Sequence, residues 1–107
     1  GDREKIEQVI FNLLKNGYNY AKSKIIITVD KIPGNKVTIS IENDGEPIPE
    51  ADLHKIWNKF YTTSNNYQRG LGLYITSNIL KAHKSKYGVI NRENSVKFYF
   101  TLDLDKE

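Results

Sequence analysis

The chain has 107 residues, with 16 lysines and arginines against 13 aspartates and glutamates, which gives a net charge of +3. This length suits one domain with a core of its own and is short for two. The chain has no cysteine, so it can form neither a disulfide nor a thiolate metal site. It also lacks an apolar run of membrane-spanning length and a signal-peptide pattern.

The first predicted element is an amphipathic helix over residues 3–21. Its apolar residues recur at three- and four-residue spacing and form a core-facing stripe of Ile6, Val9, Ile10, Leu13, Leu14 and Gly17. On a neighbouring face, Asn12 and Asn16 lie one turn apart, between Gln8 and Tyr20. Asparagine is a mediocre helix former, but its oxygen suits Mg²⁺ and its amide suits phosphate. From this helix alone, two solvated asparagines on a half-buried helix are an equally good interpretation.

Two strands and a turn-rich segment follow this helix. Residues 24–30 form a β-branched run, and residues 36–43 alternate apolar and polar side chains as a strand with one buried face does. A Pro-Gly pair between them favours a reverse turn, so the two strands are predicted to form a hairpin. Residues 43–49 are rich in turn formers, and Pro49 is well placed to open a short helix. The apolar face of that helix would comprise Leu53, Ile56, Trp57 and Phe60.

The next predicted elements are a loop and a further helix. Residues 61–69 are polar without periodicity, as in an ordinary surface loop. The glycines of residues 70–73 open a helix predicted over 73–83, whose apolar face would contain Ile75, Ile79 and Ala82. Glycines just before a helix let an anion reach its free N–H groups, although glycine also serves tight turns and close packing.

A second hairpin completes the predicted fold. Its strands cover residues 87–91 and 95–102, and its buried side chains would be Val96, Phe98, Phe100 and Leu102. These elements predict an α+β fold, a two-layer α/β sandwich in which a mixed, mostly antiparallel sheet is covered on one face by three helices. We interpret residues 1–107 as a single domain of a longer protein.

Four segments, taken in order, resemble the motifs of the ATP-binding catalytic domain of sensor histidine kinases. This branch belongs to a family that also contains DNA gyrase, the mismatch-repair ATPases and the heat-shock chaperone ATPases. The N box matches NLLKNGYNYA within the helix over residues 3–21, and the adenine-binding box matches ENDGEPIPE at residues 42–50. The aromatic box resembles IWNKFYT at residues 56–62, and the last glycine box resembles RGLGLYI around residues 70–73. The resemblance covers nearly the whole chain, and its closing pattern favours a bacterial sensor kinase.

The resemblance implies a binding site for Mg-ATP. Asn16 would bind Mg²⁺ and Asn12 would lie next to the phosphates, which makes these two asparagines the candidate catalytic residues. Tyr20 would lie against the base or ribose, and Gly45 would let the chain pass close to adenine. Residues 61–69 would form a mobile lid over the nucleotide. The implied nucleotide-binding residues are Asn12, Asn16, Tyr20, Asn43, Asp44, Gly45, Ile48, Phe60, Arg69, Gly70, Leu71, Gly72 and Leu73.

The chain departs from the family pattern at three positions. Asn43 stands where the family has an Asp that accepts a hydrogen bond from the adenine amino group. Asparagine can also accept this bond, but without the charge that makes it stronger. Asp44 is the alternative, yet a shift of one residue would point its side chain elsewhere, so we prefer Asn43. Pro47 replaces a glycine and removes a donor. Asn19 replaces a residue that is often basic, which could pass phosphate contact to Lys15, Lys22 or Arg69.

The resemblance also implies the reaction and the partners of the whole protein. A sensor histidine kinase transfers the γ-phosphoryl group to a histidine on a separate dimerisation domain, and a response regulator acts downstream. His54 and His83 are interpreted as structural or solvent-exposed rather than as this acceptor. The domain alone is expected to be a monomer that binds ATP without completing turnover. We expect the full-length protein to be a homodimer anchored in the bacterial membrane, with this domain in the cytoplasm.

The sequence leaves other functions open for this fold. The domain could be a degenerate nucleotide-binding or signalling interaction module of the same fold, with weak or no ATP binding because of Asn43 and Pro47. Retention of the paired asparagines and of the two glycines in residues 70–73 argues against that interpretation. A serine kinase of the same fold would need an acidic base in the first helix, where Gln8 is uncharged. No nucleic-acid partner is expected, because the basic residues do not cluster.

Overall fold

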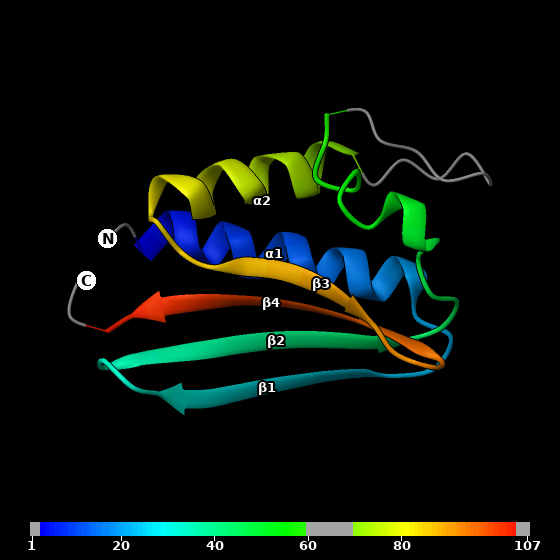
Figure 1. Cartoon of the computed structure of the whole chain (residues 1–107), viewed down its shortest axis with the longest axis horizontal. Coiled ribbons are helices and arrows are strands. Elements are labelled where there is room, and N and C mark those ends of the chain that lie inside the picture. The colour runs from blue at the N-terminus through cyan, green and yellow to red at the C-terminus, as the bar shows by residue number, and fades with distance from the viewer. Residues whose placement is uncertain (1–2, 60–69, 105–107) are drawn as a thin grey trace.

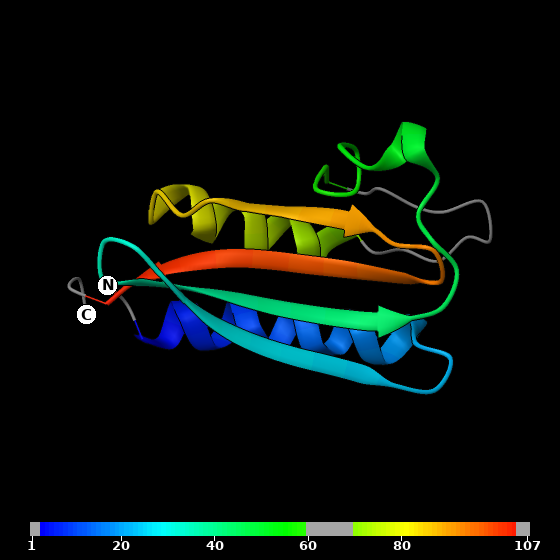
Figure 2. The same ribbon diagram turned by 60° about the horizontal axis from the view of Figure 1, so that its bottom comes forward.

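The computed structural model of the chain describes residues 3–59 and 70–104. Within these residues, two α-helices lie side by side on one face of a four-stranded sheet (Figures 1 and 2). The helices are α1 (Arg3–Tyr20) and α2 (Gly70–Ala82). The strands are β1 (Ile25–Ile32), β2 (Lys36–Asp44), β3 (Tyr87–Asn91) and β4 (Ser95–Asp103), in the order β1-β2-β4-β3. The predicted α+β sandwich is therefore present.

Both predicted hairpins are confirmed, but the prediction of a mixed sheet is wrong. β1 pairs with β2, β3 pairs with β4, and β2 pairs with β4 in the middle, all of them antiparallel. β2 and β3 run in the same direction (Figure 1). They would have formed a parallel pair as neighbours, but β4 lies between them. With this order of strands, no parallel pair occurs in the described sheet.

Two α-helices cover the described sheet, instead of the three that were predicted. After β2 the chain makes a single 3-10 turn, η1 (Glu50–Asp52), and continues in turns to residue 59. Its backbone bonds are mostly of the tighter i to i+3 kind, such as Leu53 N–H to Glu50 O at 3.3 Å and Lys55 N–H to Asp52 O at 2.8 Å. A segment of ten residues is too short to favour an α-helix by itself.

Aromatic contacts hold this turn segment against the sheet. Trp57 meets the ring of Tyr87 edge-on at a centroid distance of 5.0 Å and that of Phe98 at 5.8 Å. Ile56 beside it is fully buried. The prediction that Trp57 packs against the core is confirmed. Phe60 lies outside the described residues.

The core lies between the helices and the sheet. The predicted stripe of α1 is confirmed by the burial of Val9, Leu13 and Gly17. In β4, Val96, Phe98 and Phe100 are buried as predicted, and Leu102 packs against the core at its edge.

The prediction of which α2 residues face the core is wrong except for Ile79. Ile75 is 38% exposed and Ala82 is exposed, whereas Thr76 and Ser77 are buried. The hydroxyl of Ser77 donates to the carbonyl of Tyr74 at 2.8 Å, which lets this polar side chain face the core.

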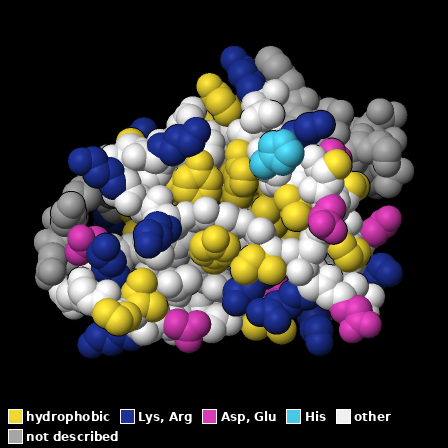
Figure 3. All heavy atoms as spheres, in the orientation of Figure 1, with side chains coloured by type: hydrophobic (Ala, Val, Ile, Leu, Met, Phe, Trp, Pro, Cys, Tyr) yellow, Lys and Arg dark blue, Asp and Glu magenta, His cyan; other side chains and the backbone are white. Residues whose placement is uncertain are grey.

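On the face that Figure 3 shows, some lysine and arginine side chains stand singly and others form a group at the lower edge. Acidic and apolar side chains lie among them. Within the described residues, neither helix is both long and apolar enough to cross a membrane.

Candidate functional site

The elements that contain the described residues of the predicted site meet at one end of the sandwich, on the right in Figure 1. The last turns of α1, the end of β2 and the first turn of α2 all lie there. These three pieces come from distant parts of the sequence. Their meeting results from the fold, because α1 and β2 both end at the edge where α2 begins.

The two asparagines of α1 lie on the side of the helix that faces its neighbours. Asn16 is buried, with 7% of its surface exposed. The amide nitrogen of Asn12 lies 3.3 Å from the hydroxyl of Thr76 and 3.4 Å from the carbonyl of Gly72, and it donates to both. The side chain of Asn12 therefore joins the N box to the first turns of α2.

Asn43 and Asp44 occupy the end of β2 and point to opposite faces of the sheet. Successive side chains of a strand alternate between its faces. Asn43 shares the helix-covered face with Ile41, which packs near Gly17 of α1. Asn43 is only 3% exposed, and its amide nitrogen donates to the carbonyl of Asp44 at 3.1 Å. Among the described residues, the side-chain oxygen of Asn43 has no hydrogen-bond donor.

The carboxylate of Asp44 lies on the open face of the sheet, where it accepts hydrogen bonds from the loop between α1 and β1. Its Oδ1 accepts the backbone N–H groups of Lys22, Ser23 and Lys24 at 2.9–3.0 Å. Its Oδ2 accepts the hydroxyl of Ser23. The hydroxyl of Ser23, followed by these N–H groups, holds the pKa of Asp44 well below its usual range. Asp44 thus has a structural role that does not involve the helix-covered face.

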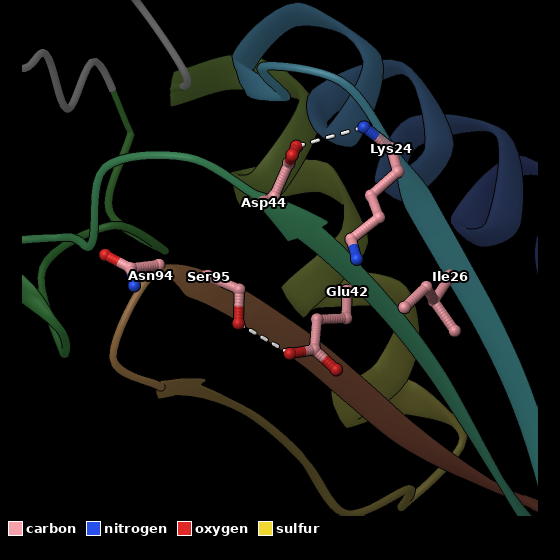
Figure 4. Close-up of a pocket in the computed structure, with 6 residues that line it drawn as sticks. All are labelled: Lys24, Ile26, Glu42, Asp44, Asn94 and Ser95. Atoms are coloured by element: carbon pink, nitrogen blue, oxygen red, sulfur yellow. Dashed lines mark hydrogen bonds between the residues drawn. The ribbon is translucent and has the colours of Figure 1, made fainter.

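A shallow polar pocket adjoins Asp44 on this open face (Figure 4). Its volume is about 260 Å³, and it is lined by Lys24, Ile26, Glu42, Asp44, Asn94 and Ser95. The hydroxyl of Ser95 donates to Glu42 at 2.5 Å, and Arg92 lies 3.5 Å from the same carboxylate. This pocket is separate from the predicted site, with which it shares only Asp44.

Gly45 is required by its backbone and by its neighbour in α1. Its φ is +135°, and a Cβ at this position would lie 2.8 Å from the carbonyl oxygen of Tyr20. The N–H of Gly45 donates to the carbonyl of Asn94 at 3.0 Å. The glycine lets the chain leave β2 directly beside the end of α1.

Ile48 is buried and is held by a residue that the sequence did not single out. The side-chain amide of Asn91 donates to the carbonyl of Ile48 at 2.6 Å, and its oxygen accepts the N–H of Ile48 at 3.0 Å. Ile48 is 3% exposed. Asn91 ends β3, 43 residues away in the chain. In the sequence, the only signal for this role of Asn91 is its place at the end of a predicted strand.

The glycine box begins α2 instead of preceding it. α2 starts at Gly70, three residues earlier than predicted, so Gly70, Leu71 and Gly72 lie in its first turn. Leu73 is buried in the core. Arg69 and the predicted lid over residues 61–69 lie outside the described residues. The N-terminus of α2 nevertheless lies at the same end of the sandwich as Asn12, because Asn12 bonds to Gly72.

The two histidines lie on different segments, His83 just after the last residue of α2 and His54 in the turn segment over residues 50–59. The ring Nδ1 of His83 lies 2.9 Å from the carbonyl of Ile79, within its own helical turn, and His54 is exposed. This agrees with the structural or solvent-exposed roles expected of them.

A two-layer sandwich with paired asparagines on one helix, a buried amide at a strand end and a glycine-rich helix start belongs to the class of nucleotide-binding ATPase domains. Residues 1–106 match the family described as histidine kinase-, DNA gyrase B- and HSP90-like ATPase, and the chain belongs to this family. Within it, the chain is a catalytic ATPase domain of the sensor histidine kinase type. The resemblance inferred from the four motifs is confirmed.

Its relatives include sensor kinases that are much longer than this chain. The adaptive-response sensory kinase SasA of Synechococcus sp. is 36% identical over 110 residues, which cover 94% of this chain and 28% of SasA. Sporulation kinase A of Bacillus subtilis is 37% identical over 95 residues, which cover 85% of this chain and 14% of that kinase. The chain thus spans less than a third of the length of these curated relatives.

The fold matches a solved histidine kinase catalytic domain. The nucleotide-free catalytic domain of histidine kinase ThkA superposes with a TM-score of 0.82 at 38% identity, over 95% of this chain and 68% of that one. ThkA in complex with the response regulator TrrA gives a TM-score of 0.82 at 37% identity, over 100% of this chain and 31% of that one.

Proposed function

We propose that this domain binds Mg-ATP at the end of the sandwich where α1, β2 and α2 meet, and presents the γ-phosphoryl group to a histidine of a separate dimerisation domain. The family membership establishes an ATPase domain of the histidine kinase type. The observation that carries the residue-level proposal is the meeting of Asn12, Asn43 and the first turn of α2 at one end of the fold.

Asn43 is proposed to recognise adenine in place of the Asp of the family pattern. It is almost fully buried, and its oxygen has no donor within the described part of the chain. Leaving a buried polar atom without a partner is costly, and an adenine amino group would supply the missing donor. Asp44 is excluded from this role in the proposal, because its carboxylate accepts four hydrogen bonds on the other face.

The remaining contacts are assigned by position. Ile48, fixed by Asn91, would form an apolar wall, and Tyr20 would lie against the base or ribose. The first turn of α2 would offer N–H groups to the phosphates, with the positive end of the helix dipole behind them. Asn12 would lie beside these phosphates, since its amide already reaches Gly72.

Asn16 is proposed as the protein ligand of Mg²⁺. A neutral amide oxygen at the edge of a buried helix face fits an ion that takes few protein ligands and completes its shell with phosphate oxygens and water. When bound, this ion would neutralise phosphate charge during phosphoryl transfer. The protein contributes mainly positioning, because this reaction requires little covalent chemistry from side chains.

The partners of the complete kinase are part of the same proposal. The solved complex of ThkA with TrrA supports a response regulator as the downstream partner. We also propose that the complete protein is a homodimer anchored in the membrane, with this domain on the cytoplasmic side, as the resemblance to sensor kinases implies.

Calorimetric titration tests the proposal. The protein is titrated with ADP and with a non-hydrolysable ATP analogue, with and without Mg²⁺, and with the matching guanine nucleotides. We expect adenine-selective binding that Mg²⁺ strengthens. Asn43→Ala should weaken it at least tenfold, through the loss of one or two buried hydrogen bonds. Asn78→Ala is the matched control, because Asn78 is exposed on α2.

Each result has a defined meaning. Binding that Asn43→Ala leaves unchanged would refute the adenine assignment but keep the ATPase domain. If the Asn16→Ala variant binds nucleotide with the same dependence on Mg²⁺ as the folded wild-type domain, the metal assignment is refuted. If the folded domain binds no nucleotide, the degenerate interaction module becomes the better interpretation.

A further inference from the structure

The side chains of Asn12 and Thr76 meet where α1 and α2 lie side by side (Figure 1). The amide nitrogen of Asn12 donates to the hydroxyl of Thr76 at 3.3 Å and to the carbonyl of Gly72 at 3.4 Å. Both distances exceed the usual range of about 2.7–3.2 Å, so neither acceptor holds the amide firmly alone. The amide of Asn12 is held by the two acceptors together.

These contacts define which end of the Asn12 amide faces α2. A carbonyl oxygen can only accept a hydrogen bond, so the atom of Asn12 that faces the carbonyl of Gly72 is the nitrogen. The reversed orientation would bring two carbonyl oxygens together, and they would repel each other. The side-chain oxygen of Asn12 is therefore turned away from these acceptors. It accepts no hydrogen bond from any residue that the structure describes.

The hydroxyl of Thr76 is the acceptor that depends on the side chain at this position. Thr76 is fully buried, and within the described part of the chain Asn12 is the one partner of its hydroxyl. Burying a hydroxyl costs free energy, and a valine of nearly the same shape would fill this place in the core without that cost. The carbonyl of Gly72, in contrast, is backbone and also takes part in the i to i−4 bonding of α2. The hydroxyl is therefore specific to the contact with Asn12.

The geometry of α1 brings the oxygen of Asn12 close to Asn16. The two residues are one turn apart, so their side chains are neighbours on one face of the helix. Helical side chains lean toward the N-terminus, so the side chain of Asn16 lies over the turn that contains Asn12. An amide oxygen is repelled by phosphate oxygens, but it attracts a cation or accepts hydrogen bonds from water bound to one. The oxygen of Asn12 thus suits the metal side of the proposed site.

We infer that Thr76 is a positioning residue for Asn12. By accepting a hydrogen bond from the amide of Asn12, its hydroxyl keeps the side-chain oxygen of Asn12 directed to Mg²⁺ and its bound water. Asn12 then acts beside Asn16 as an oxygen for the ion and not as an amide donor to phosphate. The inference rests on the proposed binding of Mg-ATP. It adds Thr76, which lies one residue beyond the last of the four motifs.

Calorimetry tests this role in binding. The affinity for a non-hydrolysable ATP analogue is measured with and without Mg²⁺, and the ratio of the two affinities is the Mg²⁺ gain. Thr76→Val removes the hydroxyl but keeps the shape, so it should reduce the Mg²⁺ gain about fivefold. Its affinity without Mg²⁺ should not fall, because the released amide of Asn12 can then donate to phosphate.

Two matched variants serve as controls. Thr76→Ser retains the hydroxyl and should restore the wild-type Mg²⁺ gain. Ser77→Ala should leave the gain unchanged, because Ser77 is also a buried hydroxyl but bonds within its own helix. Circular dichroism verifies that each variant is folded.

Two further measurements separate positioning from a purely structural role. In an Asn12→Ala background, Thr76→Val should reduce the Mg²⁺ gain no further, because its hydroxyl acts through Asn12. In the protein without nucleotide, the NMR order parameter of the Asn12 side-chain amide should fall below about 0.6 in Thr76→Val, the range of flexible groups. It should keep its wild-type value in Thr76→Ser. The amide signal is identified by its absence from the spectrum of Asn12→Ala.

The outcomes distinguish this inference from the proposed function. Thr76→Val overturns the inference if it leaves the Mg²⁺ gain unchanged, or if it weakens binding equally with and without Mg²⁺. A Thr76→Ser variant as defective as Thr76→Val would also overturn it. In each of these cases, nucleotide binding by the wild-type protein would keep the proposed function. If the folded wild-type protein binds no nucleotide, the proposed function fails and this inference fails with it.

Discussion

Replacement of Gly45 by alanine should destabilise the domain strongly, through two separate effects. The φ of +135° is a conformation that costs a non-glycine residue about 1–3 kcal/mol. The added Cβ would also lie 2.8 Å from the carbonyl oxygen of Tyr20, and relief of this clash must move backbone, at a cost of about 1–3 kcal/mol. Together they predict a loss of roughly 3 kcal/mol, which for this size of domain lowers Tm by about 10–20 °C.

The assay is urea and thermal unfolding without nucleotide, with Gly72→Ala as the matched control. Apart from its chain neighbours and the backbone of its own helix, no atom of the described residues lies within 4 Å of a Cβ built on Gly72, which is in α2. Alanine there should stabilise the free protein by about 0.5–1 kcal/mol, since it favours a helix over glycine. It should nevertheless weaken ATP binding if phosphates approach this turn closely. A Gly45→Ala variant within 1 kcal/mol of wild type would refute the reasoning.

Two further residues give predictions about stability. Asp44→Asn should lower the urea midpoint at pH 7. The donors around Asp44 hold its folded pKa below the unfolded value near 4, so the stabilisation is present above that pH and is lost as the pH falls. The difference between the midpoints of wild type and variant should therefore begin to shrink as the pH falls below about 4 and continue to shrink toward the lower folded pKa, and a difference that is independent of pH would contradict this origin. Asn91→Ala should cost about 2 kcal/mol in urea unfolding, because it leaves the buried N–H and C=O of Ile48 without their partner. A loss under 0.5 kcal/mol would show that water replaces both bonds.

The period-two pattern of β2 was sufficient to predict the side on which Asn43 lies. Val37, Ile39 and Ile41 alternate with polar residues, so Asn43 falls on their face and Asp44 on the other. The structure agrees, with Asn43 buried and Asp44 bonded to the loop on the open face. This part of the site followed from local geometry, which a single sequence contains.

Features that depend on distant partners did not follow from the sequence. Asn91 reaches Ile48 across 43 residues, and no spacing rule connects them. The inward face of α2 was misjudged because hydropathy counts Thr76 and Ser77 as polar, whereas both hydroxyls form hydrogen bonds within the helix layer. The third helix was predicted from four apolar residues, too few to outweigh the cost of nucleating a helix.

One part of the proposed site is held by the sheet layer, through Asn91, and another part is held within the helix layer, through Asn12. Asn91 attaches Ile48 to the sheet, whereas Asn12 attaches the first turns of α2 to α1 within the helix layer. If the helices shifted slightly over the sheet, the distance between the proposed base contacts and the proposed phosphate contacts would change. The hydrogen bonds within each layer would remain. Buried residues between the layers, such as Phe98, could then tune nucleotide affinity without touching the nucleotide.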